Sequence, residues 1–198
     1  MNYLRKQLFS GISIADDEWE EVQTLFKKTI YEKGQIIHNA GKVMDKIYYL
    51  KEGVVKSSFI SDEGKEFVWQ IYFKAEKVHK HNVLLDDCVS YYEQIPSRLS
   101  FEVLEKCICY ETTWNALENL YDRDTKWQKL GRLLTQQGYA SAYKRSLSLL
   151  GMSALDRYKA LVMEFPCIFD RVKSYHVAAY LGITPQSLSR LKKIIIDE

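Results

Sequence analysis

The spacing of hydrophobic residues divides the chain into a β-rich first half and a helical second half. Between residues 33 and 112, short runs rich in Ile, Val, Tyr and Phe are separated by polar residues and glycines. Runs of this kind predict strand following strand without intervening helices. The segment VVKSSFISDEGKEFVWQIYF predicts a hairpin, because Gly64 takes the positive φ of a tight turn at little cost. We therefore expect an antiparallel barrel or jelly roll rather than a parallel α/β sheet.

Helical spacing appears on both sides of this part. Residues 14–30 have acids in front, lysines behind and apolar residues three or four apart, which predicts a short N-terminal helix. From Trp114 to Leu150 there is no proline, and apolar residues recur at helical intervals. The polar YDRD separates a short helix from a long one that starts near Asp124. A helix of about 25 residues is about 38 Å long, more than a small barrel needs, so we expect its spare length to pack on a second copy of the chain.

The last part of the chain predicts further helices. GMSALDRYKALVMEFP opens with Ser153 and Asp156 in a spacing that resembles a capping box. SYHVAAYLGITPQSLSR then meets the four demands of a helix-turn-helix. Ala178 is small where two helices cross, and Gly182 suits the turn. Thr184 and Pro185 suit the start of the second helix, and apolar residues fill the buried positions 177, 181, 183, 188 and 191.

The exposed residues of that second helix are candidates for DNA contacts. Gln186 and Arg190 are four apart on one face, and each makes bidentate bonds to a base edge, adenine for Gln and guanine for Arg. The serines and Thr184 suit phosphate or close base contacts, and the two lysines suit phosphate. We interpret His176 and Lys173 either as backbone contacts or as ordinary surface residues. The predicted DNA-binding residues are Thr184, Gln186, Ser187, Ser189, Arg190, Lys192 and Lys193.

Charge and composition agree with this division. The net charge is only +2, but residues 171–196 hold five Lys or Arg and no acid. Such a basic segment suits a polyanion partner. No run of about 18 apolar residues and no signal peptide are present, so we expect a cytoplasmic protein without membrane contact. The four cysteines form no CxxC pair, which favours reduced thiols over a disulfide or a metal site.

A β-roll, a long helix and a C-terminal helix-turn-helix in this order resemble the Crp/Fnr superfamily of bacterial transcription regulators, named after the cyclic-AMP receptor protein and the fumarate–nitrate reduction regulator. Two segments show the resemblance, KGQIIHNAGKVMDKIYYLKEGVVK at 33–56 and VAAYLGITPQSLSRLKK at 177–193. The resemblance implies a homodimer joined along the long helix. It also implies two recognition helices about 34 Å apart on a palindromic double-stranded DNA site. An unknown small-molecule effector and contact with RNA polymerase are further expectations of this kind.

Two departures from the superfamily concern the effector and the end of the chain. Cyclic-nucleotide binders carry a Gly-Glu pair and then an Arg followed by Ser or Thr. Here Arg98 is followed by Leu99 and no Gly-Glu pair precedes it, so a response to cyclic AMP is not expected. Arg98 remains the one candidate for contact with an effector. The aromatic residues of the roll either line an effector pocket or pack in the core; they are Tyr48, Tyr49, Trp69, Tyr72, Tyr91 and Tyr92. Only IIIDE follows Lys193, too short for the β-hairpin wing that many relatives carry.

The sequence therefore predicts an α+β chain with three parts. These are a β-roll sensor domain (1–112), a connecting and dimerisation helix (113–150), and a helix-turn-helix DNA-binding domain (151–198) that lacks most of the wing. The predicted function is transcription regulation without enzymatic activity, metal or cofactor. A cupin-like metal enzyme is one alternative, with His79, His81, His38 and Asp86 or Asp87 as ligands. A ligand-binding module that does not bind DNA is the other.

Overall fold

The computed structural model describes residues 2–73 and 83–196, and a long hairpin dominates the sheet. Strands β3 (Lys46–Ile60) and β4 (Glu66–Phe73) pair antiparallel from Ile60 with Glu66 back to Val54 with Phe73. The turn between them is closed by a hydrogen bond from Ser61 N to Lys65 O of 2.8 Å, and Gly64 has a φ of 76°. The predicted hairpin and its glycine are confirmed.

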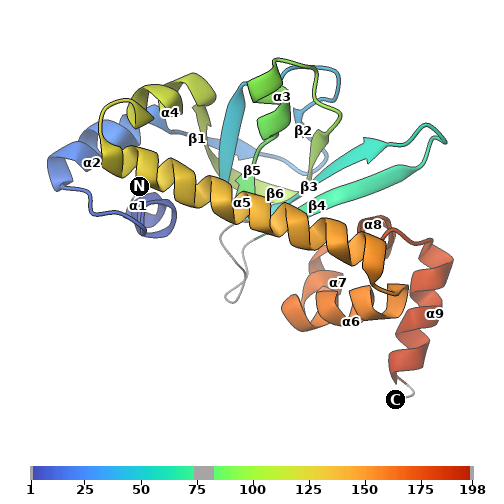
Figure 1. Ribbon diagram of the computed structural model, residues 1–198. Helices are drawn as coiled ribbons and strands as arrows, with labels where there is room; N and C mark the ends of the chain where they lie inside the picture. The colour runs from blue at the N-terminus through green and yellow to red at the C-terminus, as the bar shows by residue number, and fades with distance from the viewer. Residues whose placement is uncertain (1, 74–82, 197–198) are drawn as a thin grey trace.

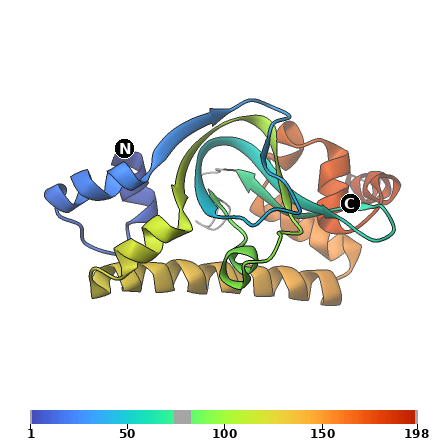
Figure 2. The same cartoon turned by 90° about the horizontal axis from the view of Figure 1, so that it is seen from above.

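All six strands of the described chain pair antiparallel in one sheet that curls into a roll (Figure 2). The sheet order is β1-β6-β3-β4, with β2 on β6 and β5 on β3. Gly53 marks the bend of β3: its φ is 97°, and an added Cβ would lie 2.4 Å from the Cβ of Cys107. The β3–β6 register shifts on both sides of Gly53, as at a bulge that bends a strand. The other strands are β1 (Lys27–Tyr31), β2 (Ile36–His38), β5 (Leu84–Leu85) and β6 (Ser100–Thr113).

Two sequence expectations about the first half are wrong. The expected helix over 14–30 ends early, as α2 (Asp16–Val22) and a 3₁₀ turn (Gln23–Leu25), because Thr29 and its neighbours pair with β6. The β-branched Thr29 and Ile30 suit a strand better than a helix. The strands are also not free of helices, since α3 (Cys88–Glu93) lies between β5 and β6 and is capped by Asp87. Helix α1 (Asn2–Leu8) precedes α2 and packs Leu4 into the core.

The long helix lies along the roll and connects it to the C-terminal helices (Figure 1). After α4 (Trp114–Tyr121), α5 (Thr125–Gly151) runs for 27 residues, about 40 Å at 1.5 Å per residue. Asp124 caps it by accepting the amide of Lys126, so the predicted start is confirmed. No helix among the described residues is long and apolar enough to cross a membrane.

Four helices follow α5 and share a core with the roll. Ser153 caps the first of them through the amide of Asp156, and its own hydroxyl donates to the Asp156 carboxylate. Val68 and Phe73 of β4 belong to the same buried cluster as Leu181 and Leu188 of the C-terminal helices. The predicted α+β architecture is confirmed. The helices are α6 (Ala154–Glu164), α7 (Ile168–Arg171), α8 (Ser174–Leu181) and α9 (Pro185–Ile196).

Candidate nucleic-acid interface and effector cavity

The corner between α8 and α9 has the backbone that its sequence predicts. Gly182 ends α8 in the left-handed region with a φ of 68°. Next to it, the amide of Ile183 donates to the carbonyl of Ala178 over 3.0 Å. Ala178, Leu181 and Leu188 are buried where the helices cross. These contacts close the helix-turn-helix, and the structural roles predicted for Ala178 and Gly182 are confirmed.

Thr184 begins α9 as its N-cap. Its Oγ1 accepts the amide of Ser187 over 3.1 Å and lies 3.0 Å from the Ser187 hydroxyl. Pro185 follows in the first turn, where its missing N–H costs nothing. The hydroxyls of Thr184 and Ser187 are therefore engaged with each other at the start of α9.

One face of α9 is exposed and carries Gln186, Ser189, Arg190 and Lys193. Among the described residues, no ion pair engages Arg190 or Lys193. Lys192 differs from them, since it is half-buried, donates to Ser174 Oγ over 3.2 Å and lies 3.5 Å from the ring centre of Phe169. Lys192 thus ties α9 to the helices before it, whereas Arg190 and Lys193 project outward.

His176 on α8 does not lie at the surface. The expectation of a surface or DNA-backbone contact is wrong, because His176 is only 5% exposed. Its Nδ1 lies 3.3 Å from Nζ of Lys56 and 3.8 Å from a carboxylate oxygen of Glu66. Burial and the Lys56 charge lower the pKa of His176 to about 4, so the ring is neutral near pH 7. Lys173 is exposed near the ring of Tyr175.

Polar contacts lie at or across the boundary between the C-terminal helices and the roll at three further points, which together with His176 we call the seam. The first point, at Lys56, consists of ion pairs within the roll. Lys56 of β3, with its side chain 3% exposed, forms ion pairs with Glu66 and with Glu102, the latter over 3.0 Å. Arg171 of α7 pairs with Glu105 over 3.0 and 3.2 Å.

The third point is Arg145 of α5. It donates to Val68 O and Trp69 O of β4 and to Tyr180 O of α8, and its guanidinium lies 3.8 Å from the Tyr180 ring centre. Because it touches β4 and α8 at once, Arg145 joins the long helix, the roll and the helix-turn-helix.

The exposed face of α5 is unusually apolar near its C-terminal end. Tyr139, Tyr143, Leu147 and Leu150 recur at intervals of four, four and three residues and are more than half exposed. Residues at this spacing share one side of a helix. The rings of Tyr139 and Tyr143 stack with their centres 6.2 Å apart. We call this set the α5 stripe.

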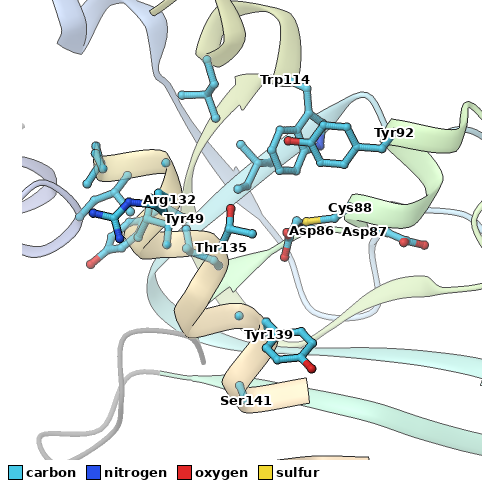
Figure 3. A pocket seen from close by; sticks show the side chains of 18 of the residues that line it. Tyr49, Asp86, Asp87, Cys88, Tyr92, Trp114, Arg132, Thr135, Tyr139 and Ser141 are labelled. Atoms are coloured by element: carbon cyan, nitrogen blue, oxygen red, sulfur yellow. Dashed lines mark hydrogen bonds between the residues drawn. The ribbon is translucent and has the colours of Figure 1, made fainter. Parts of the chain in front are cut away.

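A cavity of about 710 Å³ lies between α5, α3 and the roll (Figure 3). Four of the six aromatic residues considered from sequence line it, namely Tyr49, Trp69, Tyr72 and Tyr92. The α5 residues that complete the wall, such as Thr135, were missed, since helical periodicity alone does not reveal which face covers a cavity.

The segment before α3 offers no open place for an anionic group. Asp87 accepts the amide of Ser90 over 3.2 Å and the hydroxyl of Ser97 over 2.7 Å, so its own carboxylate occupies the start of α3. Arg98 is not among the described residues that line the cavity. Its guanidinium lies 5.7 Å from the ring centre of Phe59 on the β3–β4 hairpin.

The cupin-like alternative depends partly on residues that the structure leaves out. His79 and His81 lie outside the described residues. His38 packs edge-on against Phe101, and burial lowers its pKa. Within residues 2–73 and 83–196, no group of three or more His, Cys, Asp or Glu could hold a metal ion.

Comparisons with known proteins agree with this architecture. No protein-family model matches the chain. The chain is similar to the "Anaerobic regulatory protein" of Haemophilus influenzae, with 23% identity over 93% of this chain and 73% of that protein. The structure is similar to FixK2 from Bradyrhizobium japonicum, with a TM-score of 0.71, 16% identity, and coverage of 87% of this chain and 85% of that one.

A second structural relative is a putative Crp/Fnr-family transcriptional regulator from Eubacterium rectale, with a TM-score of 0.67, 14% identity, and coverage of 94% and 85%. This chain has the fold of the Crp/Fnr regulators. A third relative is the c-di-GMP-responsive regulator CLP of Xanthomonas campestris, with a TM-score of 0.69 and 14% identity over 90% of this chain and 91% of that one. The expected resemblance to the Crp/Fnr superfamily is confirmed, with the N-terminal roll and the long helix in common.

Proposed function

We propose that this chain is a sequence-specific, DNA-binding transcription regulator of the Crp/Fnr type. The observation that carries the proposal is the outward face of α9, where Gln186 and Arg190 are exposed and Arg190 has no ion pair among the described residues. Gln and Arg are suited to bidentate bonds with adenine and guanine in the major groove. Lys193 and Ser189 flank them and suit phosphate contacts. Contact with the chromosome would place the protein in the cytoplasm.

Selection of bound sequences from a random duplex pool tests this proposal. A palindrome whose half-sites lie about one helical turn apart is the expected result. Affinity for random duplex DNA should also fall steeply as salt rises, because bound phosphates release counterions. Absence of binding at low salt would contradict the proposal.

We further propose that two copies join along the α5 stripe. Exposed apolar residues along one face of a helix are typical of a contact between two helices. Tyr143→Glu would place a charge in this contact between the two copies. The variant should therefore be monomeric by light scattering and should lose its preference for palindromic DNA. Lys144→Glu is the matched control, since Lys144 is the exposed neighbour outside the stripe. A dimeric Tyr143→Glu variant would exclude this interface.

A small molecule in the cavity between α5 and the roll would be the signal. Such a ligand changes DNA binding only if it prefers one dimer arrangement over another. The seam connects the cavity directly to the helix-turn-helix, because Arg145 lines the cavity and also contacts β4 and α8. The position of Asp87 at the start of α3 supports an effector other than a cyclic nucleotide.

A further inference from the structure

The wall of the cavity combines aromatic rings with unneutralised carboxyl groups. Trp114 is stacked on Tyr91 with ring centres 5.0 Å apart, and the ring centre of Tyr92 lies 5.9 Å from that of Trp114 and 5.2 Å from that of Tyr91. In Figure 3, Tyr92 and Trp114 lie on the same wall as Asp86 and Cys88, and Thr135 of α5 lies opposite. Rings beside an acid are a typical surrounding for an organic cation.

Asp86 is an acidic residue of this wall that forms no ion pair with another described residue. Its Oδ2 accepts the thiol of Cys88 over 2.9 Å, and no Lys or Arg among the described residues pairs with it. Glu118 also lines the cavity and accepts the hydroxyl of Tyr92 over 3.3 Å. With Asp87, three acidic residues lie on the α3 side of the cavity.

The arginines that line the cavity do not offset these acids. The guanidinium of Arg145 is directed at the carbonyl oxygens of the seam. Arg132 donates to Gln136 of its own helix over 3.2 Å, and in Figure 3 it lies beside Tyr49, at the opposite end from Asp86. Among the described residues, the end of the cavity near α3 is therefore lined by acids and by no Lys or Arg.

A second observation at this wall indicates a missing partner. The indole N–H of Trp114 is buried and has no acceptor among the described residues, and the whole side chain is only 6% exposed. Buried N–H groups are normally paired. An oxygen atom close to the amine of a bound molecule would satisfy it.

On the premise that the roll senses an effector, we propose that this cavity binds an organic cation. The ligand has an aromatic body that packs on Tyr92 and Trp114, and an amine that pairs with Asp86. Molecules whose recognised group is a phosphate or carboxylate are disfavoured, because the described wall near α3 presents Asp86 and Asp87 to that group and no Lys or Arg.

The surroundings of Asp86 favour this choice. Burial raises the pKa of its carboxyl group, and the neighbouring Asp87 raises it further, so ionisation of Asp86 is less favourable than that of an exposed Asp. A bound ammonium group removes that disadvantage. Affinity for an amine should consequently rise as pH increases through the Asp86 pKa.

Three compounds that share one body test the proposal by isothermal titration calorimetry on the full chain. They are 2-(1-naphthyloxy)ethylamine, 2-(1-naphthyloxy)ethanol and (1-naphthyloxy)acetate, which carry a positive, neutral and negative end group. The amine should bind about tenfold more tightly than the alcohol and the acetate most weakly, as expected for a charge-assisted bond beside aromatic rings.

The isosteric Asp86→Asn variant separates charge from shape. It should weaken amine binding about tenfold and leave the affinity for the alcohol within about twofold. Asp62→Asn, in the exposed β3–β4 turn, is the matched control and should leave all three affinities unchanged. Circular dichroism of Asp86→Asn checks that the variant is folded.

Several results would overturn the inference: the acetate binding as tightly as the amine, no compound binding at millimolar concentration, or Asp86→Asn retaining the preference for the amine. DNA binding of the same preparations is measured without any compound. If the protein binds a selected palindrome but does not prefer the amine, only this inference is wrong. If it prefers the amine but does not bind DNA, only the proposed function is wrong.

Discussion

Helices α8 and α9 belong to one corner, yet their polar residues have opposite surroundings. On α9, Arg190 and Lys193 are exposed and without ion pairs in the described chain. On α8, His176 is 5% exposed and lies against Lys56 and Glu66 of the roll. One helix presents charge to the solvent, while the other holds the corner on the roll.

The difference shows that the α8–α9 corner is not packed independently of the roll. Val177 and Leu181 of α8 share a buried cluster with Val68 and Phe73 of β4. The same helix surface that positions α9 also packs on the hairpin of the roll. A change in the roll that moves β4 must therefore move α9 or open the seam.

Loss of the Lys56 charge should have the largest effect on the seam. Lys56→Met keeps the apolar stem but leaves the carboxylates of Glu66 and Glu102 without their cation. We expect the free energy of unfolding to fall by about 3 kcal/mol, as when one partner of a buried ion pair is removed. Urea denaturation at neutral pH measures the change.

The matched control is Lys65→Met in the adjoining turn, where the lysine side chain is 79% exposed. Its ion pair with Glu63 is solvated, so stability should change by less than about 0.5 kcal/mol. Equal effects of the two substitutions would mean that the buried charge does not hold the seam.

Acid should open the seam through His176. Its pKa is about 4 in the folded chain and about 6.5 in the unfolded chain. Between these values the unfolded chain binds a proton that the folded chain does not. The stability from the neutral ring is therefore complete above pH 6.5 and lost as pH falls toward 4, by up to about 3 kcal/mol.

The comparison of wild type with His176→Asn isolates this contribution, because all other side chains of the seam are the same in both proteins. Unfolding free energies at pH 7 and pH 4.5 should converge for the two chains as pH falls. Parallel pH curves would show that His176 does not titrate in the seam.

The contrast between the helices also explains what could be predicted from sequence. The α9 face follows from local rules, since caps, turn glycine and helical spacing decide which side chains point outward. The burial of His176 depends on Lys56, 120 residues earlier. No local pattern contains that pairing, and the polar SYH at the start of α8 reads as surface. The roll itself was predictable from strand spacing, whereas α3 was not, because six residues are too few for a periodic signal.

On the outward face, Arg190→Ala should separate base reading from phosphate binding. We expect a loss of about 1–3 kcal/mol on the best site and a relaxed preference at one base pair. Lys193→Ala should weaken all sequences alike and reduce the salt slope by about 1. Competition assays with single-base variants of the selected site distinguish the two, and a sequence-independent loss in Arg190→Ala would assign that residue to phosphate.

Lys192 is the internal contrast on the same helix. Lys192→Ala removes its contacts with Ser174 and Phe169, so it should lower thermal stability, by about 1 kcal/mol. Lys193→Ala should not, because its side chain is exposed. If both variants were equally stable, Lys192 would have no structural role and would be a candidate for phosphate contact alone.

A last effect, on the backbone, is expected at the corner glycine that both helices share. An added Cβ at Gly182 would meet only ordinary contacts, 3.5 Å from Leu149 and 3.6 Å from Phe67, so the cost of a substitution comes from its φ of 68°. Gly182→Val should cost about 1–2 kcal/mol of unfolding free energy, and Gly182→Asn less, because Asn tolerates the left-handed region. Thermal denaturation of the pair measures the difference. If Asn and Val were equally costly, space rather than backbone conformation would decide the residue at this turn.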